Sequence, residues 1–448
     1  MIHFIDLFAG IGGIRLGAYN ALKANGIEAD CVLSSEINDK ACETYMLNFG
    51  EQPQGDIREI EEIQPFDFLL GGFPCQPFSY AGKRMGFGDT RGTLFFEIER
   101  ILNRYKPKAF LLENVRGLYT HDHGRTFRTI IEKLHDLGYG TCDLLLNSSN
   151  FGVPQNRVRL YILGILGETP KMSIHTNLGA SDSHKFKNGH NELSLFDTNC
   201  LYQYKTVGQI LEKTVDKKYL CSDTFQSQLR NVIGDDLSKL HGYRLIDYRG
   251  GQAIHSWELG KKGICTPHEI EFLNLLVTNR RHPEFGKEKD GKRLTLEQIK
   301  TFYHYDDISD IIPSLLAKGY LQEKEGRYTL VCGNMSFEVF KFLDPDSISI
   351  TLTSSDSNRL GVIQNNMARH ITPRECARLQ GFPDSFIVHP NDTYAYKQFG
   401  NSVSVPVIEA IVNDFIQQNK LALGWTAKET GINLDRKITE NKRTFAAV

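Results

Sequence analysis

The chain has 448 residues, of which 40% are hydrophobic and 24% charged, and its 52 basic and 54 acidic side chains give a net charge of −2. This composition excludes a disordered chain, and the length indicates two or three domains with sizeable cores. Because the charges nearly balance, the molecule as a whole does not attract a polyanion, and we expect any nucleic-acid surface to be local.

The sequence also indicates a cellular context and a redox state. No apolar run reaches the ~18 residues of a membrane span, and the start lacks the charged region and cleavage site of a signal peptide. We therefore expect a cytoplasmic protein without a membrane partner.

The nine cysteines contain no C-x-x-C pair, which favours reduced thiols. The segment HDH, from His121 to His123, is more typical of a solvated loop than of a metal site, so we expect no metal.

Short apolar segments alternate with helical patterns over the first third of the chain. The predicted strands are IHFIDLF, DCVLSSEI, FDFLLGGF, KAFLLENV, TCDLLLNSS and RLYILGI. This alternation predicts a parallel, doubly wound sheet with helices on both faces, and ligands of such sheets bind beyond the carboxyl ends of the strands. Cys75 follows one strand and Glu113 ends another, so both lie where chemistry is expected.

The segment DLFAGIGG, residues 6–13, joins the first strand to a helix, and its glycines let the backbone approach a ligand closely. It lacks the spacing of phosphate-cradling loops. Glu36 ends the next strand, where an acidic side chain can accept hydrogen bonds from both hydroxyls of a ribose. Together they predict a nucleoside-containing cofactor without a required pyrophosphate. Asp56 is either a partner for the adenine amino group or a turn residue.

Cys75 lies between two prolines in the segment PCQP, which fix the backbone at the end of a strand. It is either a buried packing thiol or a nucleophile, and a nucleophile has to be a thiolate. Glu113 either pairs at the sheet edge or protonates a ring that the thiolate attacks. Arg157 and Arg159 alternate with apolar residues at strand period. We therefore expect both arginines on one face, with an anionic or carbonyl partner.

The pattern changes after about residue 170, where the polar stretch HTNLGASDSHKFKNGHNE predicts a domain boundary. Farther on, the region near 266–332 contains two helices and a hairpin, an order that resembles a winged helix but is equally typical of a structural insert. A basic cluster in this region is either a phosphate-contacting patch or a solvated loop. Its members are Arg280, Arg281, Lys287, Lys289, Lys292 and Arg293.

A last helix is predicted near the end of the chain. Ser404 and Pro406 are typical of a helix start, and an apolar face follows them, so we expect this helix to pack against something large. The apolar residues are Ile408, Ile411, Val412 and Phe415. The tail after Gly424 is polar and is expected to be peripheral.

These segments occur in the order and relative placement typical of one family. The chain resembles the C5-cytosine-specific DNA methyltransferase family in FIDLFAGIGGIRLG, SEIN, GDI, GGFPCQPFS, RGTLF, ENV, QNRVRLYILG, ITPRECARLQGFPD and FGNSVSVPV. The resemblance covers about residues 1–170 and 369–415. The middle of the chain then corresponds to the family's variable target-recognition region.

The resemblance implies a fold and a division into domains. The expected fold class is α/β, a doubly wound S-adenosylmethionine-dependent methyltransferase sheet with a second, smaller mixed target-recognition domain across a DNA-binding cleft. The catalytic domain is expected over residues 1–175, completed by 396–422. The target-recognition domain is expected over 176–395, with the insert near 266–332, and the peripheral tail over 423–448.

The resemblance also implies roles for single residues. Cys75 adds to C6 of a cytosine flipped out of the duplex, and Glu113 holds N3 as the ring accepts electrons. Arg159 contacts the base, and Arg157 supports this arrangement. The residues implied at the S-adenosyl-L-methionine site are Phe8, Gly10, Gly12, Glu36, Ile37, Asp56, Ile57, Leu94, Asn401 and Val403. Among them Ile37 departs from the family, which often has a larger side chain there.

The implied partners are double-stranded DNA and a cognate restriction endonuclease acting on the same sequence, and we expect a monomer. Two alternatives are kept. One is an RNA cytosine methyltransferase, because one branch of the family methylates transfer RNA; the long middle region disfavours it. The other is a catalytically silent DNA-binding module, which is disfavoured because every matching catalytic position is present. The DNA sequence that is recognised does not follow from the resemblance.

Overall fold

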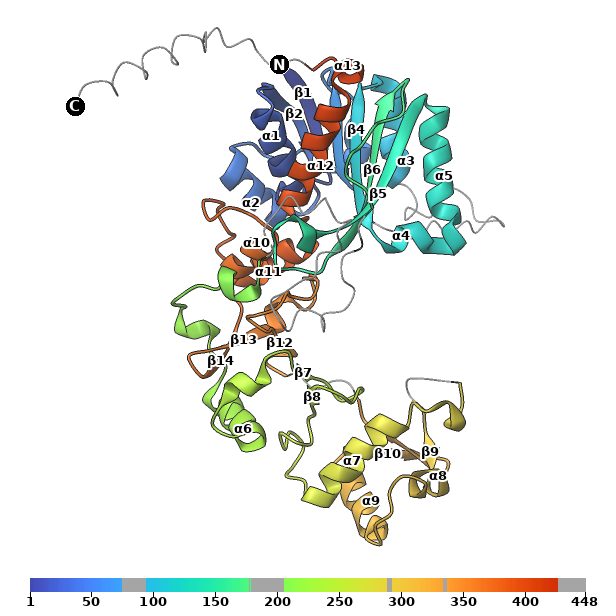
Figure 1. The fold of residues 1–448 in the computed structure, drawn as a ribbon, viewed down its shortest axis with the longest axis vertical. Coiled ribbons are helices and arrows are strands. Elements are labelled where there is room, and N and C mark those ends of the chain that lie inside the picture. The colour runs from blue at the N-terminus through green and yellow to red at the C-terminus, as the bar shows by residue number, and fades with distance from the viewer. Residues whose placement is uncertain (75–93, 177, 179–204, 288–291, 333–336, 426–448) are drawn as a thin grey trace, which may run out of the picture. The chain divides into compact units, whose positions relative to one another are not determined.

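The computed structural model describes residues 1–74, 94–176, 178, 205–287, 292–332 and 337–425. The chain divides into two compact units (Figure 1). The first consists of Met1–Leu146, Val158–Asn177 and Val405–Val448, and the second of Asn147–Arg157 and Leu178–Ser404. Among the helices that are described, none has the length and apolarity to cross a membrane.

The first unit is built on a sheet that contains, in the described residues, six strands in the order β2-β1-β3-β4-β6-β5. β1 pairs in parallel with β2 and β3, and β3 pairs in parallel with β4. This confirms the predicted doubly wound arrangement for the first four strands. The strands are β1 (Ile2–Leu7), β2 (Ala29–Ser35), β3 (Phe68–Gly72), β4 (Ala109–Val115), β5 (Tyr139–Asn147) and β6 (Val158–Leu166).

Helices cover both faces of this sheet (Figure 1). Leu69 of β3 shares a core cluster with Phe95 and Ile130 from the helices of one face. Its neighbour Phe68 instead stacks on Phe415 of the other face, with ring centroids 6.2 Å apart. Successive strand residues thus serve opposite layers. The helices are α1 (Gly13–Ala24), α2 (Asp39–Phe49), α3 (Leu94–Tyr105), α4 (Gly117–Thr120), α5 (Arg125–Asp136), α12 (Val405–Gln418) and α13 (Lys420–Leu423).

The prediction of an all-parallel sheet is wrong for β6, which runs antiparallel to β4. The physical reason is the length of the connection that precedes it. A parallel neighbour requires a crossover of about a dozen residues or more, usually through a helix. Only residues 148–157 join β5 to β6, and their one regular element is the short 3-10 helix Ser148–Phe151.

Two helices far apart in the sequence meet in the first unit, because α12 packs on α1 (Figure 1). Gly17 makes this close approach possible: a Cβ atom there would lie 2.7 Å from both the Ile408 Cβ and the Val405 carbonyl oxygen. The predicted apolar face of α12 is confirmed, since Ile408, Ile411, Val412 and Phe415 are all buried.

In the described part of the second unit, five short strands form a sheet in the order β14-β13-β12-β7-β8. Arg369 of β14 and Glu375 of α10 form a buried ion pair with two hydrogen bonds, 2.7 and 2.9 Å long, and Thr372 caps α10. The elements are α6 (Asp223–Ile233), β7 (Arg244–Leu245), β8 (Ala253–Ile254), β12 (Lys341–Phe342), β13 (Leu360–Gln364), β14 (Met367–His370), α10 (Pro373–Leu379) and α11 (Asp392–Asn401).

The insert near 266–332 has its own core and the predicted element order. Its described strands form a three-stranded antiparallel sheet, β10-β11-β9, as the wing of a winged helix would. Its apolar residues, including Phe272 and Leu315, form a separate cluster. The elements are α7 (Pro267–Asn279), β9 (Leu294–Thr295), α8 (Leu296–Lys300), α9 (Ile308–Ala317), β10 (Leu321–Lys324) and β11 (Arg327–Leu330).

Candidate active site

The glycine loop between β1 and α1 has a strongly curved backbone. Phe8, Gly10 and Gly12 all have positive φ angles, of 55°, 56° and 82°. A Cβ atom at Gly12 would overlap the Phe49 ring, so that position requires glycine because of close packing. A Cβ atom at Gly10 would meet nothing within 4 Å. The backbone at Gly10 is therefore accessible to a ligand, as the sequence predicted for this loop.

Glu36 is fixed by the glycine loop. One of its carboxylate oxygens accepts a hydrogen bond from the Gly10 amide, and the other accepts one from the Asn38 amide, each 2.8 Å long. A carboxylate offers about four lone-pair sites, so two remain available. The predicted ribose acceptor is thus oriented by the backbone and still able to accept hydrogen bonds from hydroxyl groups.

The predicted adenine contacts differ in their surroundings. The Asp56 carboxylate accepts hydrogen bonds from the backbone and side chain of Arg58, which lower its pKa. An adenine amino group would have to share this carboxylate with Arg58. Ile37 is 72% exposed, Ile57 is buried, and Leu94 packs on the sheet core at the start of α3.

Asp6, in the strand that leads into the glycine loop, is fully buried. Burial raises the pKa of its carboxyl group to about 7. The Tyr45 hydroxyl donates a hydrogen bond of 3.5 Å to the Asp6 carboxyl group and accepts one of 2.9 Å from Arg15. The site therefore contains a carboxyl group that stays largely protonated below neutral pH.

Glu113 and Arg159 are brought together by strand pairing. β4 and β6 place Arg159 opposite Val115, and the Arg159 Nε lies 3.2 Å from the Glu113 Oε1. The two side chains are 15% and 11% exposed. Glu113 also pairs in register with Gly72, and a Cβ atom there would lie only 3.6 Å from the Glu113 Oε2. A larger residue at position 72 would therefore contact the Glu113 carboxylate.

Cys75, the predicted nucleophile, lies outside the described residues. The segment that leads to it is described as far as residue 74. Asn114 fixes this segment, because its side-chain amide donates a buried 2.9 Å hydrogen bond to the Phe73 carbonyl oxygen. No role for Asn114 was predicted from the sequence.

Arg157 is not placed beside Arg159 as a second strand residue. It immediately precedes β6, is buried, and belongs to the second unit. Its guanidinium donates hydrogen bonds to the carbonyl oxygens of Leu352, at 2.9 Å, and Ser402. These bonds fit the predicted carbonyl partner and a supporting role. Asn401, predicted at the cofactor, ends α11 in the same unit, and Val403 is buried there.

The phosphate-contacting alternative for the basic cluster is contradicted for two of its members. Arg280 is 2% exposed and donates to the Tyr248 carbonyl, and Lys292 is 5% exposed and donates to two backbone carbonyls. Both cations are buried and donate to backbone carbonyls, where a phosphate does not reach them. Lys289 lies outside the described residues.

The composition of α9 favours the structural-insert alternative. In a winged-helix reader, the helix at this place in the element order enters the major groove, and Arg, Lys, Asn and Gln make most base contacts. The sequence of α9, ISDIIPSLLA, contains none of these residues. Its exposed residues include Asp310 and Pro313. The element order is confirmed, but this helix is poorly suited to read bases.

Comparison with known proteins identifies relatives over nearly the whole chain. The model of the family described as "C-5 cytosine-specific DNA methylase" matches residues 2–417. The Type II methyltransferase M.BanI of Aneurinibacillus aneurinilyticus is 66% identical over 418 residues, which cover 93% of this chain and 96% of that protein. The Type II methyltransferase M.HgiCI of Herpetosiphon aurantiacus is 62% identical over 422 residues, which cover 94% of this chain and 99% of that protein.

A solved structure shares the fold. It is described as a DNA modification methyltransferase encoded within a prophage of E. coli, and it matches with a TM-score of 0.52 and 20% sequence identity. The match covers 94% of this chain and 100% of the other. At this identity the likeness concerns the fold, and it agrees with the mixed α/β sheet described above.

Proposed function

Because the chain belongs to the C-5 cytosine-specific DNA methylase family and is a DNA cytosine-5-methyltransferase, we propose that it methylates a flipped cytosine in a specific duplex sequence through a covalent bond to Cys75. The observation that carries this proposal is the family match over residues 2–417. The Type II names of the relatives support a role in a restriction-modification system, with a restriction endonuclease that acts on the same sequence.

The chemistry explains why a cysteine is needed. Cytosine C5 is a poor nucleophile, and the proposed S-adenosylmethionine supplies an activated methyl group when bound. Attack of the Cys75 thiolate on C6 forms an S–C6 bond and moves an electron pair toward C5, which then takes the methyl group. Loss of the C5 proton and cleavage of the S–C6 bond release the product and the thiolate. Covalent catalysis thus replaces one difficult step by two easier ones.

Glu113 and Arg159 provide the electrostatic part of this proposal. As C6 is attacked, electron density also increases at N3, and Glu113 is the group that holds N3. Arg159 contacts one oxygen of the Glu113 carboxyl group. Arg159 is thus a positioning residue for Glu113 and a contact for the base. Because C6 is buried in a duplex, the cytosine has to be flipped out, at a cost of a few kcal/mol.

The glycine loop and Glu36 fit the proposed cofactor. The accessible backbone at Gly10 suits the methionine end, and the oriented Glu36 carboxylate suits the ribose hydroxyls. Phe8 is proposed to stack on adenine. The other proposed contacts are Gly12, Ile37, Asp56, Ile57, Leu94, Asn401 and Val403.

The test is methyl transfer from labelled S-adenosylmethionine to duplex DNA and to transfer RNA, run side by side. We expect label in DNA only, and bisulfite sequencing of that DNA then defines the target sequence. Label in RNA alone would support the RNA methyltransferase alternative, and no label in either would support the silent module. Cys75→Ser should abolish transfer and keep cofactor binding. Cys142→Ser, which removes a partly exposed thiol from β5, serves as the control.

A second experiment addresses the covalent step itself. Duplex DNA with 5-fluorocytosine at the target position should trap the enzyme, because fluorine does not leave C5 as the proton does. Mass spectrometry of the trapped complex should place the DNA on the peptide that contains Cys75. If an enzyme that methylates ordinary DNA forms no adduct with this substrate, thiolate addition is refuted.

A further inference from the structure

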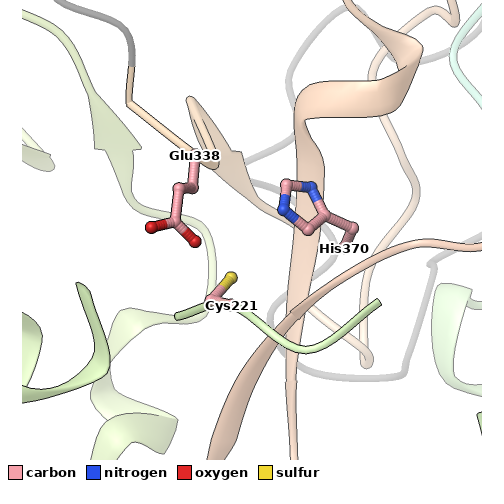
Figure 2. Close-up of side chains that lie close together, drawn as sticks. All are labelled: Cys221, Glu338 and His370. Atoms are coloured by element: carbon pink, nitrogen blue, oxygen red, sulfur yellow. The ribbon is translucent and has the colours of Figure 1, made fainter. Parts of the chain in front are cut away.

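Three side chains of the second unit converge outside the proposed active site. Cys221, Glu338 and His370 each offer one ligand atom, and these atoms lie within 4.8 Å of one another. Figure 2 shows the Cys221 sulfur between the Glu338 carboxylate and the His370 ring. In the part of the chain that is described, this is the one group of three or more such side chains.

The backbone fixes two of these residues side by side. Leu220 forms an antiparallel bridge with Arg369, and the Cys221 amide donates a 3.1 Å hydrogen bond to the Ala368 carbonyl. Cys221 therefore lies next to β14, the strand that ends at His370. Cys221 and His370 are about 150 positions apart in the sequence, and backbone hydrogen bonds hold their segments side by side.

Glu338 is oriented by the start of α6. Its two oxygens accept hydrogen bonds from the backbone amide and the hydroxyl of Ser222, at 2.9 and 2.5 Å. The bonds to Ser222 are a sufficient structural reason for a carboxylate at position 338, and a buried packing thiol is one for Cys221. These two reasons do not account for an imidazole beside them. Each carboxylate oxygen also keeps a second lone pair that can bind a cation.

The neighbours of the His370 ring determine which of its nitrogens carries the hydrogen. Its Nδ1 lies 2.9 Å from the Asn358 carbonyl oxygen, which can only accept a hydrogen bond. Nδ1 must therefore carry the hydrogen, and in the neutral ring Nε2 keeps its lone pair. This arrangement, with one ring nitrogen donating to a backbone carbonyl, is the usual one for histidines that bind metals.

We propose that Cys221, Glu338 and His370 bind one zinc ion or a similar transition metal ion, with water as a fourth ligand. Thiolate, imidazole and carboxylate are the ligand types that zinc takes in proteins. In a tetrahedral site the ligand atoms would be about 3.5 Å apart, and separations of at most 4.8 Å require the side chains to move inward by less than about 1 Å. The Cys221 thiol loses its proton as the metal binds. The bound ion joins β14, the segment before α6 and the segment before β12, and it has no part in methyl transfer.

The test uses the full-length, metal-stripped protein and Co²⁺ as a spectroscopic probe, with Zn²⁺ as competitor. We expect one Co²⁺ per chain, a thiolate-to-metal charge-transfer band, and loss of that band when Zn²⁺ is added. Cys221→Ser should remove the band. Cys332→Ser, which removes a partly exposed thiol from the same unit, should retain it. Zn²⁺ should raise the melting temperature of the wild type and of Cys332→Ser but not that of Cys221→Ser.

Glu338→Gln and His370→Gln provide a second route if Cys221→Ser does not fold. Either change should weaken Co²⁺ binding at least tenfold while the circular dichroism spectrum stays that of the wild type. Absence of Co²⁺ and Zn²⁺ binding at micromolar concentrations would overturn the proposal. A charge-transfer band that survives in Cys221→Ser, or that is lost in Cys332→Ser, would overturn it equally.

Discussion

The packing of α1 on α12 can be tested by replacing Gly17 with alanine. The new Cβ atom would lie 2.7 Å from a branched side-chain carbon of Ile408 and from the Val405 carbonyl oxygen, where ordinary contacts begin at about 3.4 Å. Neither neighbour can move without shifting α12. Overpacking of this kind costs about 1–3 kcal/mol, and the better helix propensity of alanine returns up to about 1 kcal/mol. With that gain subtracted, we expect a net loss of up to about 2 kcal/mol.

The assay is urea unfolding, with the free energy of unfolding as the readout. The matched control is Gly117→Ala in α4, because a Cβ atom there would meet only a Val115 methyl group at 3.9 Å. That variant should be neutral or more stable by up to about 1 kcal/mol. If Gly17→Ala proves as stable as Gly117→Ala, the close packing of α1 on α12 is refuted.

Three further predictions concern the candidate site. Glu36→Gln should weaken S-adenosylmethionine binding by about 10- to 100-fold in calorimetry, since it removes charge-assisted hydrogen bonds, whereas Glu43→Gln on the exposed face of α2 should not. Asn114→Ala should lower kcat about tenfold with an unchanged dissociation constant for S-adenosylmethionine, because the Phe73 carbonyl loses a buried partner worth about 1–3 kcal/mol. Asp6 has a folded pKa of about 7, raised by burial from 3.8. Its contribution to stability is therefore complete below about pH 4 and is lost as the pH rises through 7. Between pH 5 and 8 the wild type should lose on the order of 2–3 kcal/mol that Asp6→Asn does not lose.

The strands and their order in the chain could be predicted because each is a short apolar run bounded by turn residues. The direction of β6 could not, because strand patterns carry no sign of orientation. That information lay in the length of the connection, residues 148–157, which is too short for the helical crossover that parallel strands require. The start of α12 was predictable from Ser404 and Pro406, because a fixed φ angle suits the first turn of a helix.

In the candidate site, too, some features could be predicted from the sequence and others could not. Glu113 could be placed at the carboxyl edge of the sheet because it lies near the end of a strand. Arg159 begins β6, and it reaches that edge only because β6 runs antiparallel to β4. The side-chain bond from Asn114 to the Phe73 carbonyl could not be inferred, since it depends on the register between β3 and β4. The group of Cys221, Glu338 and His370 was missed for a related reason. Its members have no motif spacing, and only the folded sheet brings them together.

The basic cluster of the insert shows that charged residues in a sequence do not reveal which of their side chains are exposed. Six cations within fourteen residues indicate a local positive charge, but not the direction of each side chain. Arg280 and Lys292 point inward and satisfy backbone carbonyls, so they contribute to the stability of the insert and not to a DNA surface. Phosphate contacts depend on exposed cations, each of which adds about one to the salt slope of binding. Because α9 also lacks base-reading side chains, sequence-specific contacts are better sought in the other parts of the second unit.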